Sequence, residues 1–148
     1  MYQIKGGLRK RMKKLKRITC PYCGATAVLQ KGSYVHGEKS KEEFLYVCSN
    51  YPKCNSYVGV HAGTKIPKGT LANPELRNKR IRTHKVFDLL WKENLMTKKE
   101  AYRWMEYAMG LPKNSGHIAN FSDYRCDELI GICKNVLKNN HIELPIGA

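Results

Sequence analysis

Four of the six cysteines stand in two pairs whose spacing suits the binding of a metal ion. Cys20 and Cys23 form a C-x-x-C pair that is followed by Gly24, and five residues separate Cys48 from Cys54. Zn2+ prefers four thiolate sulfur atoms at ~2.3 Å in a tetrahedron, and a tight turn points two of them at one ion. Gly24 permits the positive φ that such a turn tends to require. We therefore expect one Zn2+ bound by Cys20, Cys23, Cys48 and Cys54.

Other interpretations of these cysteines explain less of the pattern. A redox-active C-x-x-C would account for the first pair but would leave the second pair without a role. Unligated buried thiols would not need two pairs at compatible spacing. His36 and His61 lie near the pairs in the sequence and could replace a thiolate, but four thiolates already complete a tetrahedron.

The segments around the cysteine pairs have the composition of short β-strands. Residues 25–30, 44–47 and 55–60 are rich in strand formers, and after a turn at Gly32 residues 34–36 could return as a further strand. We expect residues 19–61 to form a zinc ribbon, a small antiparallel sheet with both cysteine pairs at one end. Because such a sheet has little core, its folding should be linked to metal binding.

The remainder of the chain contains residues that typically start and end helices. Residues 62–72 contain glycine, proline and threonine without periodicity, which predicts a linker or an ordered crossing loop. Residues 73–148 are expected to form a three-helix unit, so the fold class is α+β. The helix-start signals are Asn73-Pro74, the capping box from Thr97 to Glu100, and Phe121-Ser122-Asp123. The apolar faces expected on the second and third helices are Ala101, Trp104, Met105 and Ala108, and Cys126, Leu129, Ile130, Cys133, Val136 and Leu137.

Positive charge is concentrated at the N-terminus. The 148 residues include 27 lysines and arginines and 12 acidic residues, a formal net charge of +15. Residues 1–18 form a basic arm that contains no acidic residue, whereas residues 97–148 are nearly neutral. A basic arm of this kind favours polyanions, of which nucleic acid is the commonest. The arm residues expected to contact nucleic acid are Arg9, Lys10, Arg11, Lys13, Lys14, Lys16 and Arg17.

Length and composition exclude several classes of protein. A chain of 148 residues is too short for a large multidomain enzyme, and a 42% hydrophobic content is too high for general disorder. No apolar run approaches the ~18 residues that span a bilayer, so we expect no membrane partner. The basic N-terminus is not followed by the hydrophobic stretch of a secretory signal. We therefore expect a protein of the reducing cytoplasm.

The ribbon resembles the C-terminal zinc ribbons of bacterial type IA topoisomerases. The shared residues are Cys20-Pro-Tyr-Cys23-Gly24, an aromatic and aliphatic strand, and Cys48-Ser-Asn-Tyr51-Pro52-Lys53-Cys54. The resemblance covers about 40 residues and does not include the topoisomerase catalytic domain. It implies a module that binds single-stranded DNA, with aromatic side chains stacking on bases at ~1–3 kcal/mol per base. The ribbon residues expected to contact nucleic acid are Tyr22, Tyr34, Tyr51 and Lys53.

The whole chain resembles a family of short zinc-finger-containing proteins of unknown function found in phages, prophages and mobile elements. This resemblance implies a protein of a bacterial host cytoplasm and brings no activity with it. It rests on the ribbon cysteines, on Leu76-Arg77…Arg80…His84…Phe87-Asp88…Leu90-Trp91, on Lys99-Glu100-Ala101-Tyr102…Trp104, and on His117-Ile118…Phe121…Cys126.

The first expected helix is densely basic. Arg77 and Arg80 share one side of it and are candidates for phosphate contact, although a solvated helix face explains the same pattern equally well. No helix-turn-helix signature accompanies them, so readout of a base sequence in the major groove has no support. Backbone charge and base stacking are the expected mode of binding.

The remaining candidate residues point to structure rather than to catalysis. Cys126 and Cys133 share a helix face with aliphatic neighbours and are expected to be buried thiols. His84 and Asp88 are four residues apart and are expected to form a surface pair or a satisfied core histidine, and His117 is expected to pack. A nuclease that uses these groups is a remote alternative, because no phosphate loop, nucleophile motif or carboxylate cluster accompanies them. We therefore expect no enzyme.

Two functions remain. The first is a nucleic-acid-binding protein with DNA as the expected partner and single strands as one option. The second is a protein-interaction module that binds a host complex, such as a polymerase, a nuclease or defence machinery, and inhibits or redirects it. The sequence does not separate the two, since a zinc ribbon serves either purpose.

Overall fold

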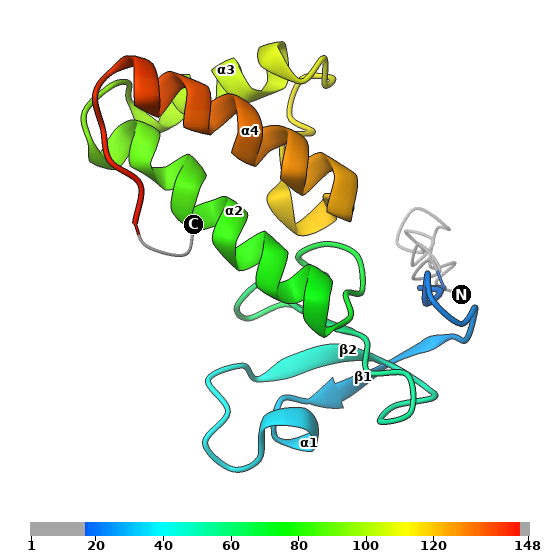
Figure 1. The fold of residues 1–148 in the computed structure, drawn as a ribbon. Helices are drawn as coiled ribbons and strands as arrows, with labels where there is room; N and C mark the ends of the chain where they lie inside the picture. Colours follow the sequence, from blue (N-terminus) through cyan, green and yellow to red (C-terminus); the bar gives the residue numbers. More distant parts are fainter. Residues whose placement is uncertain (1–16, 146–148) are drawn as a thin grey trace, which may run out of the picture.

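The computed structural model describes residues 17–145. They form a three-stranded antiparallel sheet followed by helices, which confirms the expected α+β class (Figure 1). The strands are β1 (Ala27–Lys31), β2 (Phe44–Cys48) and β3 (Tyr57–Gly59), in the spatial order β1-β2-β3. The helices are α1 (Ser33–His36), α2 (Pro74–Lys92), α3 (Lys98–Ala108), the short 3-10 helix η1 (Ile118–Asn120) and α4 (Asp123–Asn139).

The ribbon has a small core on one face of the sheet. In β2, Tyr46 and Cys48 point to the same face because side chains alternate along a strand. They pack there with Cys20, with Val58 of β3 and with Leu71 from the segment that follows the sheet. This core is thin, which agrees with the expectation that the ribbon depends on a metal ion for its stability.

Residues 34–36 do not return as a strand, contrary to expectation. Lys31 pairs with Phe44, so residues 32–43 only connect β1 to β2, and the Gly32 N–H closes this connection on the Glu43 carbonyl at 2.9 Å. No neighbouring strand is left for this segment. Its backbone therefore bonds within itself as the single turn α1, in which the His36 N–H donates to the Gly32 carbonyl at 3.0 Å.

Residues 62–72 form an ordered crossing loop, one of the two possibilities that the sequence left open. The loop pairs with the ribbon through bridges between Val60 and Pro67 and between Tyr57 and Ala72. Leu71 and Ala72 are buried, so the end of the loop belongs to the packed interior. The loop leads directly into α2 and thereby fixes where that helix starts relative to the sheet.

The helix termini follow the capping residues of the sequence. The Asn73 side chain accepts from Leu76 N at 3.0 Å, Thr97 and Glu100 form the reciprocal capping box, and Ser122 caps α4. Asn94 ends the first helix region with a φ of 58°, in the left-handed region. These signals act within one turn of the chain, which is why the sequence alone predicts them well.

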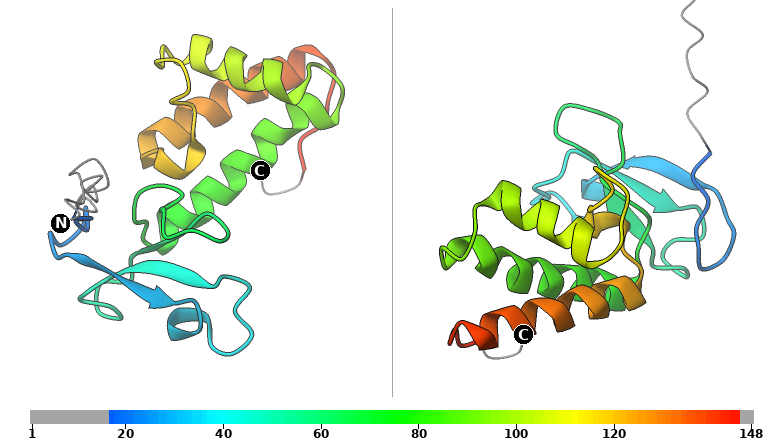
Figure 2. Two further views of the ribbon diagram at one scale, coloured as in Figure 1. Left: turned by 180° about the vertical axis from the view of Figure 1, so that it is seen from behind. Right: turned by 90° about the horizontal axis from the view of Figure 1, so that it is seen from above.

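The helical unit has its own hydrophobic core. α2 lies side by side with α4 and also packs on α3, while its N-terminal end lies beside the sheet (Figures 1 and 2). Ala108 was expected on the buried face of α3 but is exposed. Met109 is buried instead, because it lies four residues after buried Met105 and on the same side of the helix. The core residues are Val86, Phe87, Leu90, Ala101, Met105, Met109, Ile118, Phe121, Cys126, Leu129, Cys133 and Leu137.

Candidate metal centre and the surrounding surface

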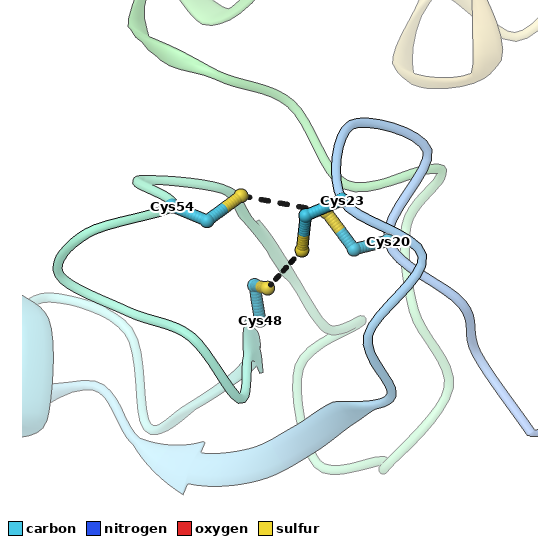
Figure 3. Close-up of side chains that lie close together, drawn as sticks. All are labelled: Cys20, Cys23, Cys48 and Cys54. Atoms are coloured by element: carbon cyan, nitrogen blue, oxygen red, sulfur yellow. Dashed lines mark hydrogen bonds between the residues drawn. The ribbon is translucent and has the colours of Figure 1, made fainter.

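The structure brings the four predicted cysteines together at one end of the sheet. The sulfur atoms of Cys20, Cys23, Cys48 and Cys54 all lie within 4.8 Å of one another. Figure 3 shows two facing pairs, with Cys20 Sγ 3.7 Å from Cys54 Sγ and Cys23 Sγ 3.3 Å from Cys48 Sγ. Sulfur atoms at ~2.3 Å from a tetrahedral ion are ~3.8 Å apart. The donor set therefore fits a single metal ion.

The first cysteine pair sits in a tight turn. The Gly24 N–H donates to the Cys20 carbonyl at 3.0 Å, and the Cys20 N–H donates to the Ala25 carbonyl at 2.7 Å. Gly24 has a φ of 75°, the left-handed conformation that the sequence led us to expect there. The turn places both sulfur atoms on the side of the chain that faces the second pair.

The second pair bridges the end of β2 and the approach to β3. Cys48 is the last residue of β2, and its carbonyl accepts from the Tyr51 N–H at 2.9 Å. The Cys54 N–H then donates to the Asn50 carbonyl at 2.9 Å, which bends the loop back towards the strand end. The five intervening residues are thus long enough for a loop that returns Cys54 to within reach of Cys20.

Two polar residues that the sequence analysis missed support the sulfur atoms. Ser56 is fully buried and its hydroxyl lies 3.4 Å from Cys20 Sγ. The Asn50 side-chain amide donates to Cys23 Sγ at 3.4 Å, and its backbone N–H donates to Cys48 Sγ at 3.5 Å. Donors to sulfur stabilise thiolates and orient ligands. A polar residue two positions after each cysteine of the second pair is the sequence signal for them.

The four thiols have unequal tendencies to ionise. Burial opposes ionisation of Cys20, but the hydrogen bond with Ser56 and nearby backbone N–H groups lower its pKa to about 6. The pKa of Cys23 is lowered by a backbone hydrogen bond at Ala25. Burial raises the pKa of Cys48, and burial together with the adjacent sulfur atoms raises the pKa of Cys54 to about 12. Four thiolates at these distances repel one another, so the cluster needs a cation to hold all of them.

Comparison with protein families identifies the chain. The model of DUF3268, described as a zinc-finger-containing domain, matches residues 16–136. The chain belongs to this family. The match includes all four clustered cysteines as well as α2, α3 and most of α4, so it spans both the ribbon and the helices. No curated protein and no solved structure matches the chain.

Two of the expected nucleic-acid contacts, Tyr34 and Tyr51, lie in one aromatic cluster on the ribbon. Their ring centroids are 5.7 Å apart, and the Tyr51 ring lies 6.5 Å from the ring of Tyr57. His36 completes this cluster with an edge contact to Tyr57 at 5.5 Å. Tyr34 is 52% exposed, so its ring is open to a ligand. We call Tyr34, His36, Tyr51 and Tyr57 the aromatic cluster.

The other expected contacts are distributed elsewhere. Tyr22 is partly exposed, but its hydroxyl accepts from the Asn73 N–H at 3.1 Å, which places it at the junction with α2 rather than in the aromatic cluster. Lys53 and Arg17 are exposed. The remaining arm residues, from Arg9 to Lys16, lie outside the described residues.

Arg80 was expected to contact nucleic acid, and the structure corrects this. Its side chain is buried at 8% exposure, and Nε donates to the Phe121 carbonyl at 3.0 Å. Its terminal nitrogen atoms donate to the Thr70 carbonyl at 2.8 Å and to the Thr70 hydroxyl at 2.6 Å. Arg80 is therefore committed to holding the crossing loop and the start of α4 against α2.

Arg77 joins the two halves of the chain. Its guanidinium carbon lies 3.8 Å from the centroid of the Tyr57 ring. Its terminal nitrogen atoms donate to the Asn55 carbonyl and side chain at 3.2 and 3.0 Å and to the Ala72 carbonyl at 2.5 Å. All these acceptors are neutral, so the charge of Arg77 keeps its capacity to attract an anion.

The remaining candidates occupy ordinary structural positions, with one exception. Cys126 and Cys133 are fully buried, as expected, and burial raises the pKa of both thiols. Asp88 lies 3.9 Å from Lys92, and its charge partly offsets the lowering of the pKa of His84 by burial. His117 is exposed rather than packed.

None of the helices between residues 17 and 145 is both long and apolar enough to cross a membrane.

Proposed function

We propose that the four-cysteine cluster binds Zn2+ and that the ribbon it stabilises binds DNA. Among common metal ions, four thiolates in a tetrahedron favour Zn2+ over the oxygen-seeking Mg2+ and Ca2+. The ion would balance the charge of the thiolates and hold the two cysteine loops together. Its role is therefore structural, and the function rests on the surface that the ribbon presents.

The single observation that carries the DNA-binding proposal is the aromatic cluster beside uncompensated cations. Tyr34 offers an exposed ring, and aromatic faces bind unpaired bases irrespective of sequence. Lys53 and Arg77 have no carboxylate within ion-pair distance among residues 17–145, so the charge of both can attract phosphates. The formal charge of +15 and the basic arm would add attraction that does not depend on base sequence.

The salt dependence of binding tests this proposal. We would titrate a fluorescein-labelled 20-nucleotide single strand and a 20-base-pair duplex with the metal-loaded full chain and follow anisotropy. Neutralising about six phosphates predicts a slope of about −4 to −5 for log affinity against log salt concentration. A flat salt dependence, or no binding at low salt to either probe, would contradict the proposal.

A protein-interaction role is the second candidate, and exposed aromatic residues on the helical unit favour it. Tyr107 on α3 is 88% exposed and Tyr124 on α4 is 73% exposed, although neither forms part of the ribbon. Exposed tyrosines are frequent anchors of protein interfaces. Affinity capture from bacterial lysate before and after nuclease treatment separates the two functions. A stoichiometric protein that survives nuclease and is lost with Tyr107→Glu supports this second function.

We also propose that the protein works in a bacterial cytoplasm and derives from a phage or mobile element. The resemblance to short zinc-finger proteins of such elements supports the origin. None of the six cysteines, all of which lie between residues 17 and 145, forms a disulfide, which supports a reducing compartment. Fractionation of a bacterial host that carries the gene tests the location.

A further inference from the structure

A groove of about 260 Å3 runs between β3 and α2, where the ribbon meets the helical unit. Val58 and Gly59 of β3 form one wall, and Ile81 and His84 of α2 form the other. The volume is slightly below the ~300–1,000 Å3 of common ligand pockets, so the groove accommodates one small chemical unit. The described residues of this region form no metal cluster, since the cysteine centre lies at the other end of β2.

Basic groups border this groove. Lys68 is exposed, and its backbone N–H donates to the Gly59 carbonyl at 2.9 Å, which fixes the residue beside β3. Arg77 also lines the groove, held in place by Tyr57 and Asn55. Neither cation has a carboxylate partner between residues 17 and 145. Glu42 is the one acidic residue among the lining residues, so the balance of charge favours an anion.

The interior of the groove is apolar. Val58, Gly59 and Ala119 provide its surface, and Ile81 is 53% exposed at its edge. A Cβ atom at Gly59 would lie 2.7 Å from the Glu42 carboxylate, so the end of this flexible side chain lies close over the β3 backbone. An exposed isoleucine next to cations that lack a carboxylate partner among residues 17–145 is the combination that a flat apolar group with an attached anion would satisfy.

The groove is continuous with the aromatic cluster. Tyr57 lines the groove and also contacts the rings of Tyr51 and His36. Through Tyr51 this contact extends to the exposed ring of Tyr34. An extended chain of alternating bases and phosphates could therefore run from Tyr34 across Tyr57 to the groove without leaving the surface.

We propose that the groove between β3 and α2 binds one unpaired nucleotide of a single-stranded nucleic acid, with its base beside Ile81 and its phosphate beside Lys68 and Arg77. This inference rests on the proposed function and names the form of nucleic acid. A paired and stacked base presents only its edges, whereas an unpaired base can enter a narrow apolar space. Single strands should consequently bind more tightly than duplexes of the same length.

Matched substitutions on and off the groove test this proposal. Ile81→Glu places a carboxylate in the groove, and Ile66→Glu makes the same change at an isoleucine that is 59% exposed outside it. Lys68→Gln removes one lining charge, and Lys65→Gln removes one from the same loop away from the groove. Affinities for the labelled single strand and the duplex would be measured with the metal-loaded full chain at one salt concentration.

We expect Ile81→Glu to bind the single strand about tenfold more weakly than Ile66→Glu, because one base contact is worth ~1–3 kcal/mol. Lys68→Gln should bind it severalfold more weakly than Lys65→Gln, because it loses a phosphate contact. Equal affinities of groove variants and controls, with wild type still binding, would overturn the groove but leave the proposed function intact. If the groove variants lose as much affinity for the duplex as for the single strand, the preference for an unpaired nucleotide is overturned. If wild type binds neither probe at low salt, both proposals fail.

A measurement on the wild-type chain tests the groove without depending on whether the variants fold. A single strand that contains 4-thiothymidine would be photo-crosslinked to the protein, and the linked peptides identified by mass spectrometry. Crosslinks to residues 57–68 or 77–84 would support the groove. Crosslinks confined to other parts of the chain would overturn it.

Discussion

The guanidinium of Arg77 stacks on the ring of Tyr57, with 3.8 Å between the guanidinium carbon and the ring centroid. This contact joins the first turn of α2 to β3, and two further bonds to Asn55 anchor the same side chain. Arg77 therefore links the ribbon to the helical unit. The relative position of these two parts decides whether the groove and the aromatic cluster form one surface.

Arg77→Lys should weaken this link between the ribbon and the helical unit. Lysine keeps the charge but lacks the planar fork that reaches Asn55 and Ala72 together while it stacks on Tyr57. We expect the free energy of unfolding to fall by about 1–2 kcal/mol, from the loss of charged hydrogen bonds in a partly exposed position. Urea unfolding of the metal-loaded chain measures this. Arg82→Lys, at an exposed position of the same helix, is the control, and equal stability of the two variants would contradict the prediction.

Cys48→Ser should abolish stoichiometric metal binding. Cys48 ends β2 and its sulfur atom lies 3.3 Å from that of Cys23, so its loss leaves three thiolates and removes the link between metal and sheet. Metal analysis after chelator washing should find about one ion per wild-type chain and less in the variant. Cys126→Ala removes a cysteine outside the cluster and should retain the ion.

Loss of the ion should unfold the ribbon before the helices. Hydrogen exchange should show fast exchange in β1, β2 and β3 of Cys48→Ser while α2 and α4 keep their protection, because the helical unit has a separate core. A Cys48→Ser ribbon that remains protected without metal would refute the structural role of the ion.

Arg80→Met should be one of the most destabilising changes in the helices. The substitution leaves the Phe121 carbonyl without its donor in a buried site and the Thr70 carbonyl without its donor in a partly buried one. Each unsatisfied buried group costs ~1–3 kcal/mol, so we expect a loss of about 3 kcal/mol. Urea unfolding measures the loss, with exposed Lys85→Met as the control. Equal midpoints for the two variants would show that Arg80 has no such structural role.

Alkaline pH should destabilise the chain partly through Cys133. Burial raises the pKa of this thiol from 9.0 to about 12, so the unfolded chain loses the proton at a lower pH than the folded chain. The contribution of Cys133 to the free energy of unfolding is constant below pH 9.0. It declines as pH rises towards about 12, by at most ~1.4 kcal/mol per pH unit. Unfolding free energies of wild type and Cys133→Val should have parallel slopes below pH 9.0 and diverge in slope above it. Parallel slopes above pH 9.0 would contradict this assignment.

The parts of the fold that the sequence predicts are those set by neighbouring residues. Gly24 and the cysteine spacing define the first turn, and Thr97 with Glu100 defines the start of α3, because the groups that interact lie within a few residues. The four-cysteine cluster itself was predictable for a further reason. Its two pairs have to converge if they are to share one ion, and this requirement supplies a long-range contact that periodicity lacks.

The parts that the sequence does not predict depend on distant partners. Arg80 resembles any basic residue of an amphipathic helix, and its burial follows from acceptors at Thr70 and Phe121, the latter 41 positions away. The segment from Tyr34 to His36 has strand composition, yet it forms a helical turn because the pairing of Lys31 with Phe44 leaves it no neighbour. In both cases tertiary context overrides local preference.

The most direct test of DNA binding by the ribbon is the affinity of Tyr34→Ala for the labelled single strand. Tyr107→Ala is the matched control, since it removes a tyrosine that is exposed on the helical unit. We predict that Tyr34→Ala binds about tenfold more weakly than wild type, from ~1–3 kcal/mol per stacked base, and that Tyr107→Ala binds as wild type does. Wild-type affinity in Tyr34→Ala, or an equal loss in both variants, would contradict the assignment of the ribbon as the nucleic-acid-binding surface.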